Sequence, residues 1–396
     1  MNGLHNFSKR FFSKRIYLWG SASRANVRKG NPAKVDFFDD KNPKKIFTGP
    51  RHSTVITDDG SLYTFGSGNW GVLGHGDETS VNHKEPKKVE FFANRGIKVI
   101  DSKAGRYHTL VLTEDNEVYT WGYGGKEGYF SWMVAQEVGA LGHGDKKPFF
   151  IPRKVKFFDD IESKVVQIAA GMYHCAALTE DGQLYTWGRG NFGVLGIGDN
   201  SYSLEPLLNE DVEYLKQEGM SPIKIDSADD YTSVLMDNGE VYGFGKNDRG
   251  QIGCGAGIGI DFQESIPVPT HLEWDGEESV PMEDVYCGQN TTLFKDDEGN
   301  MWKTGLRLDY TPKMINLENE DGVSTNITTF GCGTKHYCLV NDDNQLLVWG
   351  NMISGKSSID ISGFKLYDGD TLFNGGKVAN MSIKYGLMGV VTDHDD

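Results

Sequence analysis

One block of sequence recurs along this chain, and its fullest copy spans residues 171–199, GMYHCAALTEDGQLYTWGRGNFGVLGIGD. A run of small and branched apolar residues follows His174, and a second run that ends at Trp187 follows the pair Asp181-Gly182. Two such runs around Asp-Gly predict a β-hairpin with a type I′ turn, because both central residues of that turn have positive φ. Glycines crowd the sequence after Trp187, and they predict a tightly folded connection.

The hairpin recurs seven times, and this count bounds the fold. The second strands end in an aromatic-glycine pair or its remnant, and the residues before each glycine are Trp19, Phe65, Trp121, Trp187, Phe244, Thr304 and Trp349. The first strands occupy 51–57, 106–113, 172–179, 230–237, 289–296, 335–342 and 385–393. Repeats of this length and strand content are typical of a β-propeller, in which each repeat forms one blade.

The two sets of strands are offset at the ends of the chain. The strand Ile16–Trp19 has no first strand before it, and the strand 385–393 has no second strand after it. We therefore expect the N-terminal strand to complete the blade that the C-terminal strands begin. Further strand candidates, such as 86–92 and 152–158, give four strands per repeat, and 208–219 has the periodicity of a short helix. The prediction is an all-β, seven-bladed β-propeller closed without an open sheet edge.

The repeat is not uniform along the chain. Twenty positions separate Trp121 from Leu141, but only eight separate Trp187 from Leu195, so twelve residues are inserted at about 123–138. The Leu-Gly-x-Gly-Asp ending of the block is strong in the first half of the chain and largely lost in the second.

Composition and charge narrow the classes of function. Fifty glycines and 12% aromatic residues fit many turns between short strands. The net charge of −16 disfavours a surface that binds nucleic acid as a whole. Five scattered cysteines without a CxxC pair favour small buried residues over disulfides or zinc. No apolar run approaches the ~20 residues that cross a bilayer.

The N-terminus differs in charge from the rest of the chain. Residues 1–35 hold eight Lys or Arg and no acidic residue, whereas the remainder carries 32 basic and 56 acidic residues. The basic segment 1–15, which contains Ser and Phe, resembles a mitochondrial targeting segment; a solvated basic tail and a DNA-contacting arm are the alternatives. We therefore divide the chain into a targeting-like extension, 1–15, and a propeller, 16–396.

Three glycine-rich motifs imitate nucleotide-binding loops. The segment GNMISGKS at 350–357 satisfies the phosphate-loop pattern, but the residues after it alternate like a strand where such a loop needs a helix. GSGNWG at 66–71 and GRGNFG at 188–193 match the dinucleotide fingerprint, but they occupy equivalent repeat positions and neither precedes a helix. We interpret all three as connections of the scaffold and predict no cofactor site.

Histidine recurs at one position of the repeat, as His52, His108, His174 and His336. A ring of these side chains near the axis would suggest a metal site, but the other repeats place Tyr231, Thr291 and Leu387 there. The broken ring favours hydrogen bonds that support the repeat over metal ligation. Because no nucleophile elbow, HExxH motif or paired carboxylates are found, we predict no catalytic and no metal site.

Together these motifs resemble the repeat of the regulator of chromosome condensation family over about residues 16–393. The matching elements are Gly-x-x-His, an apolar strand, Thr-x-Asp-Gly, a strand ending in Trp-Gly, and Gly-x-Leu-Gly-x-Gly-Asp. The resemblance implies the seven-bladed propeller that the repeat count predicts. It also implies several functions. The family's founder is an exchange factor for a small nuclear GTPase, and the founder itself also binds chromatin. Other members are photoreceptors, ubiquitin-ligase modules or scaffolds, some of them mitochondrial.

The inserted loop carries the residues that we expect to bind a partner: Tyr129, Phe130, Trp132 and Met133. Burying each of these side chains is worth about 1.5–3 kcal/mol, so leaving them in water is unfavourable. Aromatic residues with Met on a protruding loop favour an interface anchor, and a loop folded back onto its own propeller is the equal alternative. In the family's exchange factor, an inserted wedge on the corresponding side acts on the GTPase.

We therefore predict a non-catalytic protein-interaction scaffold, an accessory subunit of a larger mitochondrial assembly such as a respiratory-chain complex or the mitochondrial ribosome. Its partners would be proteins of that assembly, which can lie beside a membrane. The alternative is a guanine-nucleotide exchange factor for a small GTPase, in the cytoplasm or nucleus. Chromatin binding is a third and weaker alternative, because the body of the protein is acidic.

Overall fold

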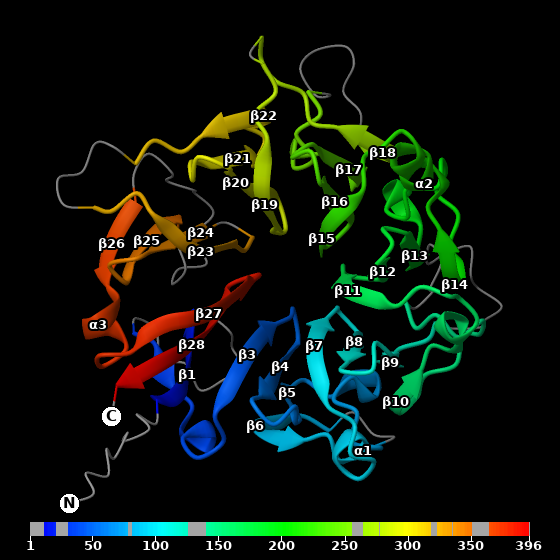
Figure 1. Cartoon of the computed structure of the whole chain (residues 1–396). Helices are drawn as coiled ribbons and strands as arrows, with labels where there is room; N and C mark the ends of the chain where they lie inside the picture. The colour runs from blue at the N-terminus through cyan, green and yellow to red at the C-terminus, as the bar shows by residue number, and fades with distance from the viewer. Residues whose placement is uncertain are drawn as a thin grey trace, which may run out of the picture.

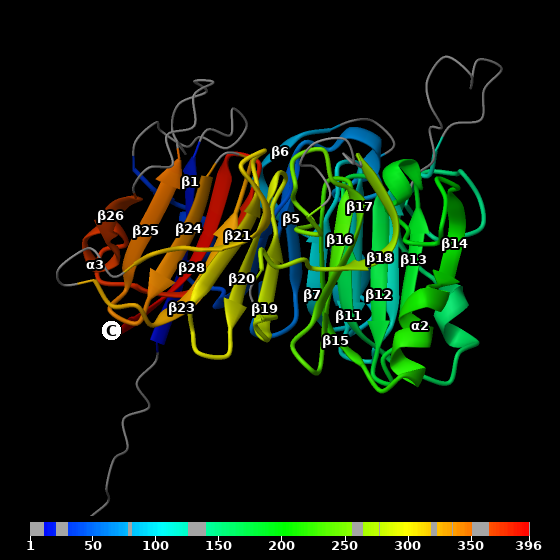
Figure 2. The ribbon, with the colours of Figure 1, turned by 90° about the horizontal axis from the view of Figure 1, so that it is seen from above.

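The computed structural model describes residues 12–20, 31–77, 81–125, 140–255, 264–276, 278–317, 323–334, 336–350 and 364–395. In this part of the chain, seven four-stranded sheets surround a central axis as blades (Figure 1). Seen from its edge, the ring is a disc whose strands run from one face to the other (Figure 2). The predicted seven-bladed β-propeller is confirmed.

Six blades are formed by consecutive strands, with the first strand nearest the axis (Figure 1). Blade 1 comprises β3 (Pro43–Thr48), β4 (His52–Thr57), β5 (Leu62–Gly66) and β6 (His83–Lys88). Blade 2 comprises β7 (Val99–Ala104), β8 (His108–Thr113), β9 (Val118–Gly122) and β10 (Phe149–Lys154). Blade 3 comprises β11 (Val165–Ala170), β12 (His174–Thr179), β13 (Leu184–Gly188) and β14 (Ser203–Leu208).

The second half of the ring continues this order. Blade 4 comprises β15 (Pro222–Ala228), β16 (Tyr231–Met236), β17 (Val241–Lys246) and β18 (Ser265–His271). Blade 5 comprises β19 (Met282–Cys287), β20 (Thr291–Asp296), β21 (Met301–Gly305) and β22 (Asp309–Met314). Blade 6 comprises β23 (Ile327–Cys332), β24 (His336–Asn341), β25 (Gln345–Gly350) and β26 (Phe364–Asp368). The closing blade comprises β27 (Lys377–Lys384), β28 (Leu387–Asp395), β1 (Phe12–Gly20) and β2 (Ala33–Lys34).

The closing blade joins the two ends of the chain, as the offset of the repeats predicts. Strand β1 pairs with β28 along its whole length, from Phe12 opposite Asp395 to Gly20 opposite Leu387. The strand begins at Phe12, so residues 12–15, which the sequence assigned to the basic extension, are part of the blade. Where the extension ends and how far the insertion at 123–138 reaches stay predictions, because residues 1–11 and 126–139 lie outside the described part.

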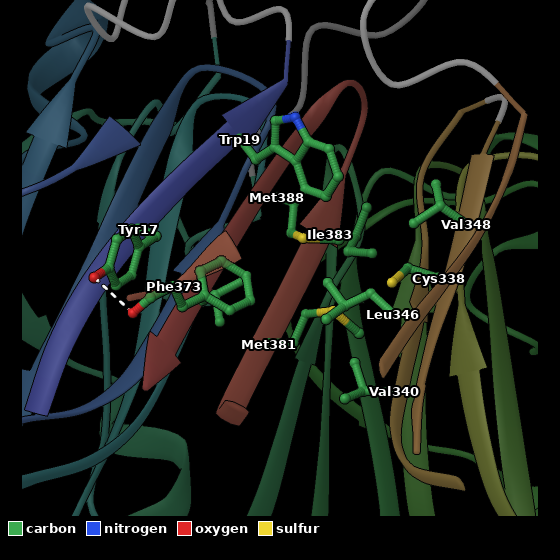
Figure 3. Close-up of a cluster of buried hydrophobic side chains, with 11 residues drawn as sticks. Tyr17, Trp19, Cys338, Val340, Leu346, Val348, Phe373, Met381, Ile383 and Met388 are labelled. Carbon is green, nitrogen blue, oxygen red and sulfur yellow. Dashed lines mark hydrogen bonds between the residues drawn. The ribbon is translucent and has the colours of Figure 1, made fainter. Parts of the chain in front are cut away.

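A buried apolar cluster holds the closing blade against blade 6 (Figure 3). Tyr17 and Trp19 from β1 lie with Met388 from β28 on one side of the cluster, and Cys338 and Leu346 from blade 6 lie on the other. The Tyr17 hydroxyl donates a hydrogen bond to the Phe373 carbonyl at 3.0 Å. Closure therefore rests on packing as well as on strand pairing.

Short helical elements connect the blades: η1 (Asp36–Phe38), α1 (Glu90–Ala93), η3 (Lys156–Asp159), α2 (Glu210–Gln217) and α3 (Gly369–Leu372). The helix predicted within 208–219 is confirmed as α2, and Asn209 caps it by accepting a hydrogen bond from the Val212 amide. Among the described residues, none of these helices has the length and apolar character to span a membrane.

The strands predicted at 86–92 and 152–158 are wrong at their ends, because β6 stops at Lys88 and β10 stops at Lys154. Consecutive residues of a strand point to opposite faces of its sheet. Here Phe91 and Phe92 both contact the ring of Tyr119, at centroid distances of 5.8 and 5.3 Å, which a strand would not allow. A helical turn places both rings on one side, and the Phe157-Phe158 pair of η3 repeats the arrangement around Tyr185.

Neighbouring blades of the first half are held together by the glycine-rich connections. Trp121, at the end of β9, donates a hydrogen bond from Nε1 to the Val72 carbonyl of blade 1 at 2.7 Å. The backbone of Gly74 packs directly against the same indole, since a Cβ on Gly74 would come within 2.8 Å of Nε1. We call this contact and its two equivalents the glycine–aromatic clamps: Gly74–Trp121, Gly142–Trp187 and Gly196–Phe244.

A second contact between blades, distinct from the clamps, explains why the dinucleotide-like motifs recur. Residues 69–71 and 191–193 form the single turns η2 (Asn69–Gly71) and η4 (Asn191–Gly193), not the start of a long helix. A Cβ on Gly71 would come within 2.5 Å of Phe150 in blade 2. These glycines allow close packing between blades, which confirms their interpretation as scaffold. The phosphate-loop-like segment lies outside the described residues from position 351 onward.

Candidate interaction surface

The ring has two unlike faces, and the antiparallel register decides which residues share each of them. Gly66, Gly122 and Gly188, which end the third strands, lie opposite the histidines that begin the second strands. The turn before each histidine and the connection after each aromatic-glycine pair therefore lie on one face, which we call the loop face. The opposite face, which we call the turn face, carries the Asp-Gly turns and α2 (Figure 2).

Arginine and tyrosine alternate on the loop face of blades 1 to 3. The Arg51 guanidinium lies 4.6 Å from the centre of the Tyr107 ring. Arg106 lies between two rings, 5.5 Å from Tyr107 and 5.8 Å from Tyr173. Arg189 lies 5.4 Å from Tyr173 on its other side. These distances are within the ~6 Å range of cation–π attraction, so each ring holds the neighbouring guanidinium in place.

Two more aromatic side chains extend this series. Tyr123 lies 6.2 Å from Tyr107, and Trp70 lies 4.9 Å from Tyr123, between ring centroids. Trp70 has φ of 61° and remains 45% exposed, which is unfavourable for a bulky apolar side chain. We call the whole set the arginine–tyrosine ridge: Arg51, Trp70, Arg106, Tyr107, Tyr123, Tyr173 and Arg189.

Backbone hydrogen bonds fix the ridge to the propeller. The Tyr123 amide donates to the Tyr107 carbonyl at 2.7 Å, and the Arg189 amide donates to the Tyr173 carbonyl at 2.9 Å. Between blades 2 and 3, the Arg106 amide donates to the Met172 carbonyl at 3.1 Å. The ridge is thus a surface with little freedom to lose on binding, which favours tight contact.

The other half of the loop face is arranged differently. Lys384, at the end of β27, reaches across the ring to blades 4 and 5, where its Nζ donates to the carbonyls of Ser227 and Cys287, each at 2.9 Å. The next residue, Tyr385, donates from its hydroxyl to Asp229 at 2.5 Å. Here the loop residues hold opposite blades together, and their polar groups are used inside the protein.

Tyr286 completes this second arrangement. Its hydroxyl donates to the Ile383 carbonyl at 3.0 Å and lies 3.2 Å from the Ile383 amide. The Tyr286 side chain thus connects β19 of blade 5 directly to β27 of the closing blade, although blade 6 lies between these blades in the ring. Gly331 of blade 6 lies beside this contact, and a Cβ there would be 3.4 Å from both Tyr286 and Ile383, an ordinary van der Waals distance. We call Asp229, Tyr286, Lys384 and Tyr385 the cross-channel latch.

Burial raises the pKa values of two neighbouring acidic residues, Asp229 in the latch and Asp230 next to it. Burial raises the pKa of Asp229 above its usual value, and the hydrogen bond from Tyr385 and the charge of Lys384 oppose that rise. The pKa of Asp230 is also raised, first by burial and then by the charge of Asp229. The two carboxyl groups thus mark an acidic border at blade 4, next to the ridge.

Three of the four recurrent histidines join blades, as predicted, whereas the Nε2 of His336 is buried without a hydrogen-bond partner among the described residues. His52 Nε2 lies 2.8 Å from Thr109 Oγ1 in the next blade, and His174 Nε2 lies 3.0 Å from Thr232 Oγ1. His108 Nε2 lies 3.2 Å from the Cys175 Sγ. Burial lowers the pKa of His52 and His174 to about 3 and that of His108 to about 4, so all three are neutral at pH 7.

Metal and thiol chemistry receive no support from the described residues. No group of three or more His, Cys, Asp or Glu side chains in that part of the chain is arranged to hold a metal ion. All five cysteines are free and buried, as the sequence predicted for small core residues. Burial raises the pKa of the Cys175 thiol, which keeps it in the unreactive form.

The predicted partner-binding residues Tyr129, Phe130, Trp132 and Met133 lie outside the described residues, so their role stays a prediction. The described base of that insertion ends in the ridge, through Tyr123. Sequence reasoning missed the ridge because it compared the repeats only at the histidine. The signal was the pair of residues before that histidine, which is Arg- and Tyr-rich in blades 1 to 3 and loses this character afterwards.

A closed propeller with a fixed surface of arginine and aromatic side chains is typical of a protein-interaction module. Comparison with known sequences gives the family: residues 11–311 match the RCC1-like domain, and this chain therefore belongs to the RCC1-like propeller family. The regulator of chromosome condensation of Xenopus laevis is 31% identical over 273 residues, 66% of this chain and 57% of that protein. RUG3, a mitochondrial RCC1 domain-containing protein of Arabidopsis thaliana, is 29% identical over 332 residues, 81% of this chain and 68% of that protein.

Other relatives are much longer, and solved structures agree on the fold. The human E3 ubiquitin-protein ligase HERC2 is 29% identical over 359 residues, which are 87% of this chain but only 7% of HERC2. Human WBSCR16 superposes with a TM-score of 0.75 at 19% identity, over 96% of this chain and 99% of that one. Prp20p of Saccharomyces cerevisiae, described with its binding to Gsp1p and histones, gives 0.76 at 19% identity, over 96% and 91%.

Proposed function

We propose that this chain is a non-catalytic interaction propeller, an accessory subunit that docks through its loop face into a larger mitochondrial assembly such as a respiratory-chain complex or the mitochondrial ribosome. The arginine–tyrosine ridge is the observation that carries this proposal. Arg, Tyr and Trp are the residues most enriched among those that dominate binding energy at protein interfaces. In the ridge they are adjacent and pre-positioned, and all of them except the buried Tyr123 are partly exposed.

The position of the ridge supports a docking role over a purely structural one. Blades 1 to 3 are already joined by the glycine–aromatic clamps and by His52, His108 and His174. These contacts join the blades independently of ridge side chains such as Trp70, which is 45% exposed. The predicted anchor at 129–133 follows the same connection that Tyr123 begins, so both features would engage one partner.

Two observations support the mitochondrial part of the proposal. Residues 1–15 are basic and free of acid, as in mitochondrial targeting segments. One relative, RUG3, is mitochondrial and similar over 81% of this chain.

Crosslinking with mass spectrometry in isolated mitochondria tests this proposal. We expect crosslinks to a stable partner from lysines of the loop face, such as Lys246, which lies 4.9 Å from the Phe192 ring. Lysines of the turn face, such as Lys216 in α2, serve as the internal control. A free monomer, a nuclear location, or crosslinks confined to the turn face would contradict the proposal.

An exchange factor for a small GTPase is the second candidate, and membership of the family favours it. The structural relative Prp20p is described with binding to Gsp1p, and an exchange factor also works by contact, without a catalytic side chain. Nucleotide-release assays with purified GTPases decide between the two. Acceleration that disappears when residues 124–137 are deleted would support exchange activity and displace the scaffold.

A further inference from the structure

We propose that the arginine–tyrosine ridge recognises an acidic, extended segment of a protein partner, through carboxylates that pair with Arg51, Arg106 and Arg189. This inference rests on the proposed docking function and names the chemistry of the partner. It is drawn from the pairing, geometry and surrounding charge of the three arginines.

The three arginines have no ion pair with a carboxylate in the part of the chain that the structure describes. Elsewhere, Arg153, Arg249 and Arg307 each lie within 4.0 Å of an aspartate oxygen, at 3.9, 3.1 and 3.9 Å. Arg51, Arg106 and Arg189 form no such ion pair with any described carboxylate, although acidic residues outnumber basic ones by 56 to 40 in the chain. Within the described residues, the Nε of Arg189 is buried without a hydrogen-bond partner. Guanidinium groups that are gathered on one face of an acidic protein, with no ion pair to a described carboxylate, favour binding of an external anion.

The tyrosines orient these groups toward a ligand. A guanidinium stacked on a ring presents its N–H groups at the edges of its plane, where a carboxylate can accept two of them. In Arg106 one of these groups is already used, because Nη1 donates to the Met172 Sδ at 3.3 Å. Arg106 shares Tyr107 and Tyr173, whose ring centres are 6.1 Å apart. Because a tyrosine ring lies between successive arginines, an extended segment with several acidic residues can bring its carboxylates to more than one guanidinium along the ridge.

The neighbouring charges distinguish a short acidic peptide from a nucleic acid. Asp229 and Asp230 lie at the end of the ridge in blade 4, close enough that Arg106 and Arg189 respectively act on their pKa values. Asp248 lies nearby and pairs with Lys246 and Arg249. A continuous polyanion would have to pass this acidic border, whereas a segment with a few acidic residues ends before it.

Binding of a defined probe to the full chain tests the inference. The probe is a fluorescein-labelled dodecapeptide of alternating Glu and Ser, and its counterpart replaces every Glu by Lys. We expect saturable binding of the Glu peptide that weakens with salt, and no binding of the Lys peptide. The triple variant Arg51→Gln/Arg106→Gln/Arg189→Gln should bind the Glu peptide about tenfold more weakly, since three partly exposed ion pairs are lost.

A matched control separates recognition from net charge. Arg95 stacks on Phe91 at 4.0 Å and Arg153 on Phe149 at 4.3 Å, both outside the ridge. The variant Arg95→Gln/Lys98→Gln/Arg153→Gln removes the same charge and should bind within about twofold of the unchanged chain. The Arg-to-Lys version of the ridge triple should bind with intermediate strength, because Lys keeps the charge but not the bidentate geometry. Thermal unfolding of each variant verifies that it is folded.

Three results would overturn the inference: no binding of the Glu peptide, equal losses in the ridge and control variants, or tighter binding of a twelve-nucleotide thymidine oligomer. Crosslinking of the variants distinguishes failure of this inference from failure of the proposed docking function. If Tyr107→Ala/Tyr173→Ala abolishes crosslinks to the native partner while the arginine triple retains them, the ridge docks a partner that is not acidic. If neither variant changes those crosslinks, docking through the ridge is wrong.

Discussion

The two halves of the loop face use the same repeat position in opposite ways. In blades 1 to 3, the clamps and histidines join neighbouring blades, and Arg106 and Tyr173 remain at the surface. On the other side the Leu-Gly motif is largely lost, and Lys384 and Tyr385 span the ring instead. Where the repeat motif is kept, it joins the blades and the loop residues are available for a partner. Where the motif is lost, the loop residues themselves keep the ring closed.

Removal of residues 381–396 should have the largest effect on this comparison. It deletes β28 and half of β27, so β1 loses its partner along nine residues. Leu387, Met388, Val390 and Val391 leave the core, and at about 1.5–3 kcal/mol each this loss is comparable to the total stability of a domain. Thermal unfolding followed by circular dichroism should lose its cooperative transition. A truncated chain that melts as late and as sharply as the full chain would contradict closure.

Acid should weaken the clamped half more than the other half, because three of the four buried recurrent histidines lie there. The pKa values of His52, His108 and His174 are lowered from 6.5 to about 3 or 4, so the unfolded chain binds more protons between those values. The contribution of these histidines to the free energy of unfolding is therefore complete above about pH 6.5. It decreases as the pH falls toward 4, by about 2–3 kcal/mol per histidine at pH 4.5. His336, with a pKa of about 4, adds a similar effect in blade 6.

Asp229 of the latch has the opposite sign. Its pKa is raised above 3.8, so the folded chain binds more protons there and gains stability as pH falls through the raised value. Hydrogen exchange at pH 7 and pH 5 should show protection lost at β4, β8 and β12 before the latch strands. In urea unfolding, the free energy of unfolding of His174→Gln should fall between pH 7 and pH 4.5 by about 2–3 kcal/mol less than that of the unchanged chain. Uniform loss of protection would contradict the contrast between the halves.

The latch should contribute several kcal/mol at neutral pH. Lys384→Met leaves the Ser227 and Cys287 carbonyls without their donor, which should destabilise the chain by about 2–4 kcal/mol. Lys377→Met, an exposed position on the same strand, is the matched control and should be nearly neutral. Denaturant unfolding measures both variants. Equal effects would show that Lys384 does not hold the ring.

A pair of glycine variants isolates one clamp. Gly74 and Gly76 both have positive φ, 75° and 84°, so alanine strains both backbones alike. Only at Gly74 would the new Cβ come within 2.8 Å of the Trp121 indole; at Gly76 the nearest atom is 3.4 Å away. We expect Gly74→Ala to cost about 1–3 kcal/mol more than Gly76→Ala in denaturant unfolding. If the two variants are destabilised equally, backbone strain alone explains the loss, and the contact between Gly74 and Trp121 does not stabilise the ring.

The sequence predicted the parts of the molecule that repetition encodes. The blade count, the offset closure and the histidine contacts follow from comparing equivalent positions, and α2 follows from its own periodicity. The sequence predicts strands through the Val-x-Phe-Phe turns, because it cannot show that both phenylalanine rings contact one tyrosine. The latch could not be predicted, since Lys384 and Ser227 are 157 positions apart and no repeat relates them.

The ridge had a local signal that repetition concealed. The residues before His108 and His174 include Tyr107 and Tyr173, and only the ring of blades brings those two tyrosines within 6.1 Å. A position that varies between repeats is uninformative for the fold, but it is where a surface can be specialised. The same reasoning keeps Tyr129, Phe130, Trp132 and Met133 as predicted anchors.

The central claim, that the ridge docks a partner and does not hold the ring, is tested most directly by comparing stability with partner recovery in one pair of variants. Tyr107→Ala/Tyr173→Ala changes the ridge, and Tyr202→Ala/Tyr214→Ala changes two tyrosines outside it that are 41% and 60% exposed. Quantitative affinity purification from mitochondria should recover the native partner with the control variant and not with the ridge variant. Both variants should unfold within about 1 kcal/mol of the unchanged chain. Full recovery of the partner by a folded ridge variant would contradict the account.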